Sequence, residues 1–169
     1  DSFNEIWLVD FEFDAPPGED PTPVCLVAKE LKSRQTLRLW QDEMGRLKLP
    51  PYPTDSYSLF VAYYASAEFG CHLSLNWPLP ENVLDLFTEF RSLTNGKPTP
   101  SGRGLLGALA YYGLPCMDVV EKNTMRDLVL RGGPWSAQER LDIFDYCESD
   151  VISLEKLLPN MSPHLDIPH

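Results

Sequence analysis

The stretch Ile6–Asp14, with the sequence IWLVDFEFD, is apolar until acidic residues appear towards its end, and it predicts a buried β-strand. Side chains alternate along a strand, so Asp10, Glu12 and Asp14 share one face and the aromatic residues between them point to the other. A buried carboxylate is unfavourable unless it is paired or binds a metal ion. The spacing of Asp10 and Glu12 directs both carboxylates to one point above the sheet, as a metal site requires. The alternative is a strand that ends in solvent, where acidic residues are harmless.

Four further strands are expected downstream of this one. Short polar or proline-rich turns join it to Val24–Leu31 and Thr36–Trp40, and such connections predict three antiparallel strands. Ser58–Tyr64 predicts a fourth, buried strand. The hydrophobic period becomes helical over Ser66–Asn76 and is followed by a short fifth strand at Asn82–Leu86. A strand–helix–strand unit of this kind predicts that the fourth and fifth strands are parallel.

The rest of the sequence predicts helices, apart from Met44–Thr54, which is expected to be a proline-rich connection. The last helix starts at Ser136, where Glu139 completes a capping box. It is expected to end near Leu158, because Pro159 follows. The other helices are expected at Phe87–Leu93, Gly104–Tyr112 and Lys122–Leu130.

This order of elements predicts an α/β fold in which helices flank a mixed five-stranded sheet, three antiparallel strands followed by two parallel ones. The length of 169 residues fits one domain, which we expect to span residues 1–160. Residues 161–169 contain prolines and histidines, and we expect them to form a linker to a further C-terminal part of a longer polypeptide.

Charge and cysteine content narrow the classes of function. The chain has 14 basic and 25 acidic residues and a net charge of −11, which argues against a surface that coats a nucleic-acid backbone. An enzyme that grips a chain end through carboxylate-bound metal ions remains compatible with this charge. Four cysteines without a Cys-x-x-Cys pair argue against a zinc site of cysteines and histidines and favour a reducing, cytoplasmic location. No apolar run approaches the roughly 20 residues that cross a bilayer, so no membrane partner is expected.

The last helix carries a second pattern, YCESD, in which Tyr146 and Asp150 lie one turn apart on the same face. Taken alone, acidic residues on a helix are typical of a solvated face. The combination is more specific, because a strand Asp-x-Glu and a helical Tyr-x-x-x-Asp about 140 residues later resemble the tyrosine subclass of the DEDD superfamily of 3′–5′ exonucleases. The resemblance implies a ribonuclease H-like fold.

The resemblance extends over almost the whole chain. Glu68, in YYASAEFG, stands at the start of a helix where the superfamily usually has Asp, and Asp85, in VLDLF, resembles its acid on the fifth strand. The stretches NWPLPENVLDLFTEFR, GLLGALAYYGLP and MRDLVLRGGPW are most similar to the proofreading domain of bacterial and phage family A DNA polymerases. We expect Glu68 to be the metal-site acid and Asp85 to tie the fifth strand to the following helix. The alternative is that Asp85 is the ligand.

By this resemblance, the site binds two Mg²⁺ or Mn²⁺ ions, which prefer carboxylate oxygens. Asp10 is expected to bridge the two ions, with Glu12, Glu68 and Asp150 completing their shells. Two such ions can activate an attacking water and stabilise the leaving oxygen of a phosphodiester. Tyr146 is expected to orient that water, because a phenol with a pKa near 10 is a poor base at neutral pH.

Three cations and one histidine complete the set of candidate residues. Lys122, Arg126 and Arg131 are candidates for contacts with substrate phosphates; the alternative is that they are solvated cations of a helix surface. His72 lies on an apolar helix face and is expected to be a core histidine.

Together these patterns predict a two-metal-ion 3′–5′ exonuclease that acts on single-stranded or frayed DNA 3′ ends. By the resemblance, it is the proofreading domain of a polymerase in the same polypeptide. One alternative is a ribonuclease D-like enzyme that acts on RNA 3′ ends. The other is an exonuclease fold that has lost catalysis and serves as a structural module of a polymerase. All four expected metal-site positions are acidic, which argues against the second alternative, whereas Glu68 in place of the usual Asp argues for it.

Overall fold

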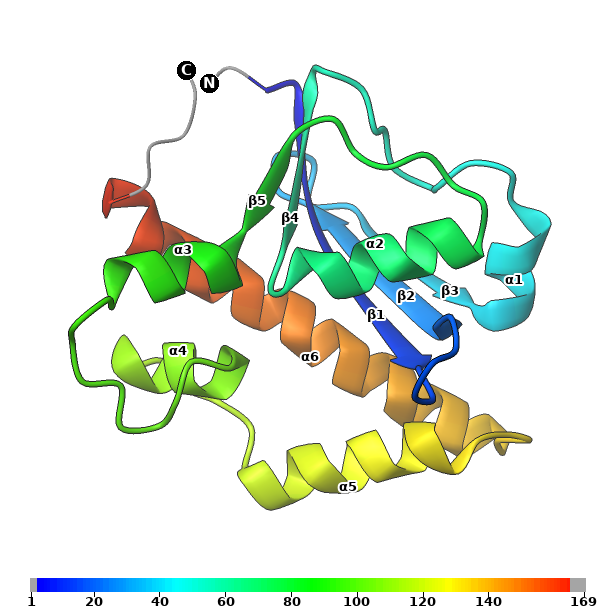
Figure 1. Cartoon of the computed structure of the whole chain (residues 1–169). Coiled ribbons are helices and arrows are strands. Elements are labelled where there is room, and N and C mark those ends of the chain that lie inside the picture. Colours follow the sequence, from blue (N-terminus) through cyan, green and yellow to red (C-terminus); the bar gives the residue numbers. More distant parts are fainter. Residues whose placement is uncertain (1–2, 165–169) are drawn as a thin grey trace.

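The computed structural model describes residues 3–164, in which helices flank a five-stranded sheet (Figure 1). The strand order is β3-β2-β1-β4-β5. β2 is antiparallel to β1 and β3, whereas β4 is parallel to β1 and β5. The predicted α/β class and mixed sheet are therefore confirmed. None of the helices within residues 3–164 is both long and apolar enough to cross a membrane.

The strands differ in length, and β1 is the longest of them. The strands are β1 (Glu5–Asp14), β2 (Thr22–Glu30), β3 (Thr36–Trp40), β4 (Ser58–Ala62) and β5 (Val83–Asp85). The helices are α1 (Gln41–Arg46), α2 (Ala65–Ser74), α3 (Leu86–Leu93), α4 (Leu105–Tyr111), α5 (Val119–Arg131) and α6 (Ala137–Met161).

Helices cover both faces of the sheet, and the alternation of side chains along β1 supplies a core on each side. Trp7, Val9 and Phe11 pack with residues of α1 and α2, whereas Leu8 packs with residues of α3, α4, α5 and α6. Helix α6 runs along its face of the sheet (Figure 1). Its buried positions recur at the three- and four-residue steps of one helix face and include Ile143, Cys147, Val151 and Leu154.

Two helices differ from the sequence prediction: α1 was not expected at all, and α5 begins earlier than expected. Helix α1 overlaps the start of the expected connection Met44–Thr54, and Met44 is fully buried in the core. Helix α5 begins at Val119 rather than at Lys122, because Asp118 caps it by accepting hydrogen bonds from the backbone N–H groups that follow. Side-chain acceptors mark both helix starts: Glu43 accepts a hydrogen bond from the backbone N–H of Trp40 at α1, and Asp118 caps α5.

The C-terminal helix extends beyond the residue expected to stop it, so the predicted end near Leu158 was wrong. Helix α6 passes through Pro159 and ends at Met161, although proline lacks the N–H that continues the hydrogen-bond ladder. Met161 is fully buried, and this apolar contact holds the last turn in place. A short 3₁₀ helix, η1 (Ser162–His164), follows. Residues 165–169 of the expected linker lie outside the described residues.

Candidate metal centre

The candidate site lies where β1 extends past its parallel neighbour. β4 pairs with β1 only from Glu5 to Leu8, after which the chain leaves the sheet towards α2. On the other side, β2 continues to pair with β1 alongside Asp10 and Glu12. The two carboxylates therefore stand where β4 no longer covers the edge of β1. A cleft of about 390 Å³ opens there.

Three elements contribute functional side chains to this cleft. Asp10 and Glu12 come from β1, and Glu68 comes from the first turn of α2. Helix α6 contributes Tyr146 and, one turn later, Asp150. The structure thus brings together all five residues that the sequence analysis assigned to metal binding and catalysis.

Glu68 is the most deeply buried of the four acids. Its exposed fraction is 3%, and its Oε2 atom has no hydrogen-bond partner among the described residues. Burial raises the pKa of the Glu68 carboxyl well above its ordinary value, and the nearby charge of Asp10 raises it further. A buried carboxylate oxygen without a partner is destabilising, and a bound cation would satisfy it.

The other three carboxyl groups are also in an unfavourable electrostatic environment. Burial raises the pKa of both Asp10 and Glu12 well above the ordinary value, and Asp150 adds repulsion to each. Burial raises the pKa of Asp150 as well, although the charge of Lys122 opposes this effect. Since hard divalent cations bind carboxylate oxygens, this set of donors fits Mg²⁺ or Mn²⁺. The best candidates to hold such ions are Asp10, Glu12, Glu68 and Asp150.

One cation of the chain itself reaches into the cleft. Nζ of Lys122 lies 3.1 Å and 3.3 Å from the two carboxylate oxygens of Asp150. Arg126, one turn along α5, also lines the cleft. Arg131 does not line it and instead forms an ion pair of 2.7 Å with Glu139 at the start of α6. Two of the three cations, Lys122 and Arg126, therefore line the cleft, and Arg131 does not.

Tyr146 is buried beside the carboxylates, and its ring centroid lies 5.4 Å from Nζ of Lys122. Burial is the main cause that raises the pKa of its phenol above the ordinary value, and the charges of Glu12 and Asp150 add to it. The hydroxyl is therefore protonated at neutral pH. It can donate a hydrogen bond but cannot serve as a base, which is the state that a water-orienting role requires.

Asp85 lies outside the cleft and organises the chain next to it. Its Oδ1 accepts hydrogen bonds from the backbone N–H groups of Tyr64 at 2.9 Å and Phe87 at 3.0 Å. Its Oδ2 accepts a hydrogen bond of 3.2 Å from the hydroxyl of Thr88. These bonds tie the end of β5 to the start of α3 and to the segment that leads into α2. The expected tie between the fifth strand and the next helix is present.

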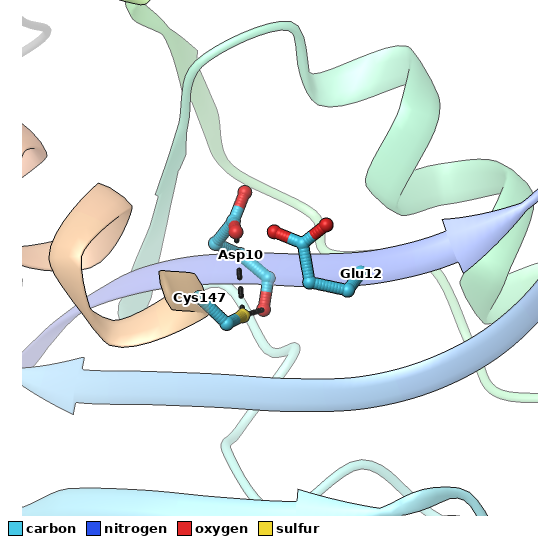
Figure 2. Close-up of side chains that lie close together, drawn as sticks. All are labelled: Asp10, Glu12 and Cys147. Atoms are coloured by element: carbon cyan, nitrogen blue, oxygen red, sulfur yellow. Dashed lines mark hydrogen bonds between the residues drawn. The ribbon is translucent and has the colours of Figure 1, made fainter. Parts of the chain in front are cut away.

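The structure adds Cys147, which the sequence analysis did not name as a site residue. Sγ of Cys147 lies 3.3 Å from both the backbone carbonyl oxygen and Oδ2 of Asp10 (Figure 2). One potential ligand atom from each of Asp10, Glu12 and Cys147 lies within 4.8 Å of the others. Cys147 stands between Tyr146 and Asp150 in the sequence, which was the available signal, but it also occupies an apolar position of the helical period.

Comparisons with known proteins identify no relative: no protein-family model matches this chain, and no curated protein matches it. The resemblance described above therefore rests on the residues quoted for it.

Proposed function

We propose that this chain is a metal-dependent 3′–5′ exonuclease that hydrolyses the terminal phosphodiester bond of a nucleic acid, with single-stranded or frayed DNA as the favoured substrate. The observation that carries the proposal is the convergence of four carboxylates and one tyrosine from β1, α2 and α6 in a single cleft. Neither a strand that ends in solvent nor a solvated helix face accounts for acids that meet in this way.

The carboxylates are suited to hold two divalent cations. Their negative charges would attract two Mg²⁺ or Mn²⁺ ions, and the unpartnered Oε2 of Glu68 would gain a cation to bind. When bound, such cations acidify a water molecule and stabilise negative charge on the leaving oxygen. The number of ions is taken from the resemblance to DEDD exonucleases.

The other cleft residues of the chain bind and orient. Tyr146 keeps its proton, so its hydroxyl can hold a water by one hydrogen bond beside the carboxylates. Lys122 and Arg126 place positive charge on the α5 side of the cleft, where it attracts the anionic phosphates of a nucleic-acid strand.

The substrate end and the partner follow from the sequence resemblance. Similarity to the proofreading domain of family A polymerases supports a DNA 3′ end as substrate and a polymerase region of the same polypeptide as partner. The described cysteines are all free thiols, which supports a reducing, cytoplasmic setting.

One observation favours a second candidate function, a catalytically silent module of a polymerase. The ammonium group of Lys122 lies 3.1 Å from the carboxylate of Asp150 and neutralises it. With this ion pair, Asp150 needs no metal ion to balance its charge. If this candidate holds, the cleft binds no divalent cation at millimolar concentration and hydrolyses no nucleic acid.

A single assay separates these candidates. A labelled single strand, as DNA and as RNA, is incubated with the chain in Mg²⁺, Mn²⁺ or EDTA, and products are resolved by length. We expect metal-dependent removal of nucleotides from the 3′ end, with DNA degraded to shorter products than RNA in the same time. Asp10→Ala combined with Glu12→Ala should give no ladder of products. A ladder only on RNA would identify the ribonuclease D-like activity. No ladder with either metal would overturn the proposed function.

A further inference from the structure

Cys147 places a sulfur atom within the acidic cluster. Its side chain is fully buried on the face of α6 that packs against the sheet. Figure 2 shows Cys147 beneath Asp10, with Glu12 next along β1. Sγ lies 3.3 Å from Oδ2 of Asp10, so a thiol donates to a carboxylate that is also a candidate metal ligand.

The spacing of these atoms suits a small tetrahedral cation. With Zn–S near 2.3 Å and Zn–O near 2.0–2.2 Å, a tetrahedral angle places the two ligand atoms about 3.5 Å apart. The observed separation between Sγ of Cys147 and Oδ2 of Asp10 is 3.3 Å. Glu12 offers a third ligand atom within 4.8 Å of the other two. Glu68 lines the cleft together with Asp10 and Glu12. Its buried Oε2 has no hydrogen-bond partner among the described residues, so Glu68 is a candidate for the fourth position.

We propose that Asp10, Glu12 and Cys147 form a site for a thiophilic divalent cation, Zn²⁺ or Cd²⁺, which competes with Mg²⁺ or Mn²⁺ for the same two carboxylates. Soft thiolate ligands select Zn²⁺ and Cd²⁺, whereas carboxylates alone suit Mg²⁺ and Mn²⁺. When the cation binds, an S–metal bond forms, the thiol proton passes to the buffer, and no electron is transferred. The site uses carboxylates of the proposed exonuclease centre, but its existence does not depend on nuclease activity.

This site differs from the cysteine–histidine zinc sites that the sequence analysis argued against. Such sites are recognised by close spacing along the chain, whereas Cys147 and Asp10 are 137 positions apart. Only the packing of α6 against β1 brings them together, so no sequence motif identifies the site.

The test measures binding of the metal alone, by isothermal titration and by the ultraviolet charge-transfer band of thiolate-bound Cd²⁺. The exposed Cys116 is replaced by Ser in every sample, and Cys147→Ser and Cys147→Ala are added separately. We expect the parent with Cys147 to show the Cd²⁺ band and to bind Zn²⁺ on the order of 100-fold more tightly than either Cys147 variant. Free Mn²⁺, followed by electron paramagnetic resonance, should rise when Zn²⁺ is added to the Mn²⁺-loaded parent.

Two results would overturn the proposal. One is a Zn²⁺ affinity that both Cys147 variants retain while circular dichroism shows them folded. The other is a parent that shows no Cd²⁺ charge-transfer band. Mn²⁺ affinity should be nearly the same in the parent and in Cys147→Ser, because Mn²⁺ depends on the carboxylates. Failure of the exonuclease proposal would instead appear as absent DNA hydrolysis, with thiolate-dependent Zn²⁺ binding intact.

Discussion

At the scale of single residues, the cleft is defined by carboxyl groups whose surroundings oppose their ionised form. Burial raises the pKa of Asp10, Glu12 and Glu68, and a neighbouring carboxylate raises each further: Asp150 for Asp10, and Asp10 for Glu12 and Glu68. Tyr146 and Lys122 differ in kind from these acids, because one holds a neutral hydroxyl and the other a positive charge in the same space. Charge and protonation state therefore distinguish the carboxylates, which would bind a cation, from Tyr146 and Lys122, which would act on water or phosphate.

Tyr146→Phe tests the role of the hydroxyl. The substitution removes one hydrogen-bond donor and leaves the carboxylates and the ring packing in place. We expect cleavage to slow by roughly one to three orders of magnitude, with little change in Mn²⁺ affinity measured by titration. An unchanged turnover would remove Tyr146 from the mechanism and leave Asp150 as the relevant residue on that helix face.

At the scale of elements, the cleft exists because β1 and β4 have different lengths. β4 stops pairing at Leu8 of β1, and the chain then turns through Tyr64, whose backbone is left-handed with φ 72°. This turn leads into α2, which packs on the face of the sheet formed by Trp7, Val9 and Phe11. The first turn of α2 thereby brings Glu68 to the cleft that Asp10 and Glu12 line. Asp85 stabilises the turn, because its carboxylate accepts a hydrogen bond from the backbone N–H of Tyr64.

Asp85→Ala and Glu68→Gln should separate support of the turn from metal binding. Asp85→Ala removes a helix cap and a tie to the turn, so we expect it to lower the free energy of unfolding by about 1–2 kcal/mol, with or without metal. Glu68→Gln removes an unfavourable buried charge, so the melting temperature in EDTA should stay the same or rise. Its nuclease activity should fall on the order of 100-fold.

Thermal melts in EDTA and in Mn²⁺, together with the nuclease assay, provide the measurement. The opposite pattern, in which Asp85→Ala abolishes activity without destabilising the fold and Glu68→Gln is fully active, would make Asp85 the ligand.

At the scale of the whole molecule, the acidic cleft should couple metal binding to folding. A cation that binds only the folded chain stabilises it by about 2.7 kcal/mol at 100 times its dissociation constant. We expect Mn²⁺ to raise the melting temperature of the wild type but not that of Asp10→Ala combined with Glu12→Ala. In EDTA the double variant should melt at or above the wild-type temperature, because the folded state no longer confines repelling carboxylates.

The matched control for this double variant is Glu19→Ala combined with Asp20→Ala, which removes the same charge from an exposed turn. The control should keep the full Mn²⁺ effect. An unfolded Asp10/Glu12 variant, seen by circular dichroism, would show that these acids serve structure rather than metal binding.

His72 makes the stability of the molecule depend on pH. It packs beside Phe11 on the α2 side of the sheet and is fully buried, as the sequence predicted. Its Nδ1 donates to the carbonyl of Pro78 at 2.8 Å, and its Nε2 accepts from the hydroxyl of Tyr52 at 2.5 Å. Burial lowers the pKa of His72 below its ordinary value. The neutral ring therefore contributes its full stability above pH ~6.5, and this contribution is lost as the pH falls towards the folded-state pKa.

His72→Asn keeps a donor for Pro78 and removes the titration. We expect the variant to be less stable than the wild type above pH ~6.5 and the difference to shrink below it, as measured by urea unfolding at several pH values. The raised pKa values of the cleft carboxyls change stability in the opposite direction, but equally in both proteins, so the difference isolates His72. A difference independent of pH would contradict this assignment.

Local pattern alone determined the strand at the start of the chain, the face that Asp10 and Glu12 share, and the single turn between Tyr146 and Asp150. These features depend on the two-residue repeat of a strand and the 3.6-residue repeat of a helix, which operate within a few residues. The order of elements likewise predicted the mixed sheet, because chain connections restrict how strands can pair. Capping and anchoring by one residue, as at Asp118 and Met161, were too small a signal to set helix ends.

Only the tertiary structure decided which side chains meet. The thiol of Cys147 lies against Asp10, Lys122 pairs with Asp150, and Arg131 turns to Glu139 instead of the cleft. Each of these contacts depends on how α5 and α6 pack against each other and on the sheet. The sequence pattern fixes the face on which a side chain lies, whereas helix packing fixes the partner to which that face is brought.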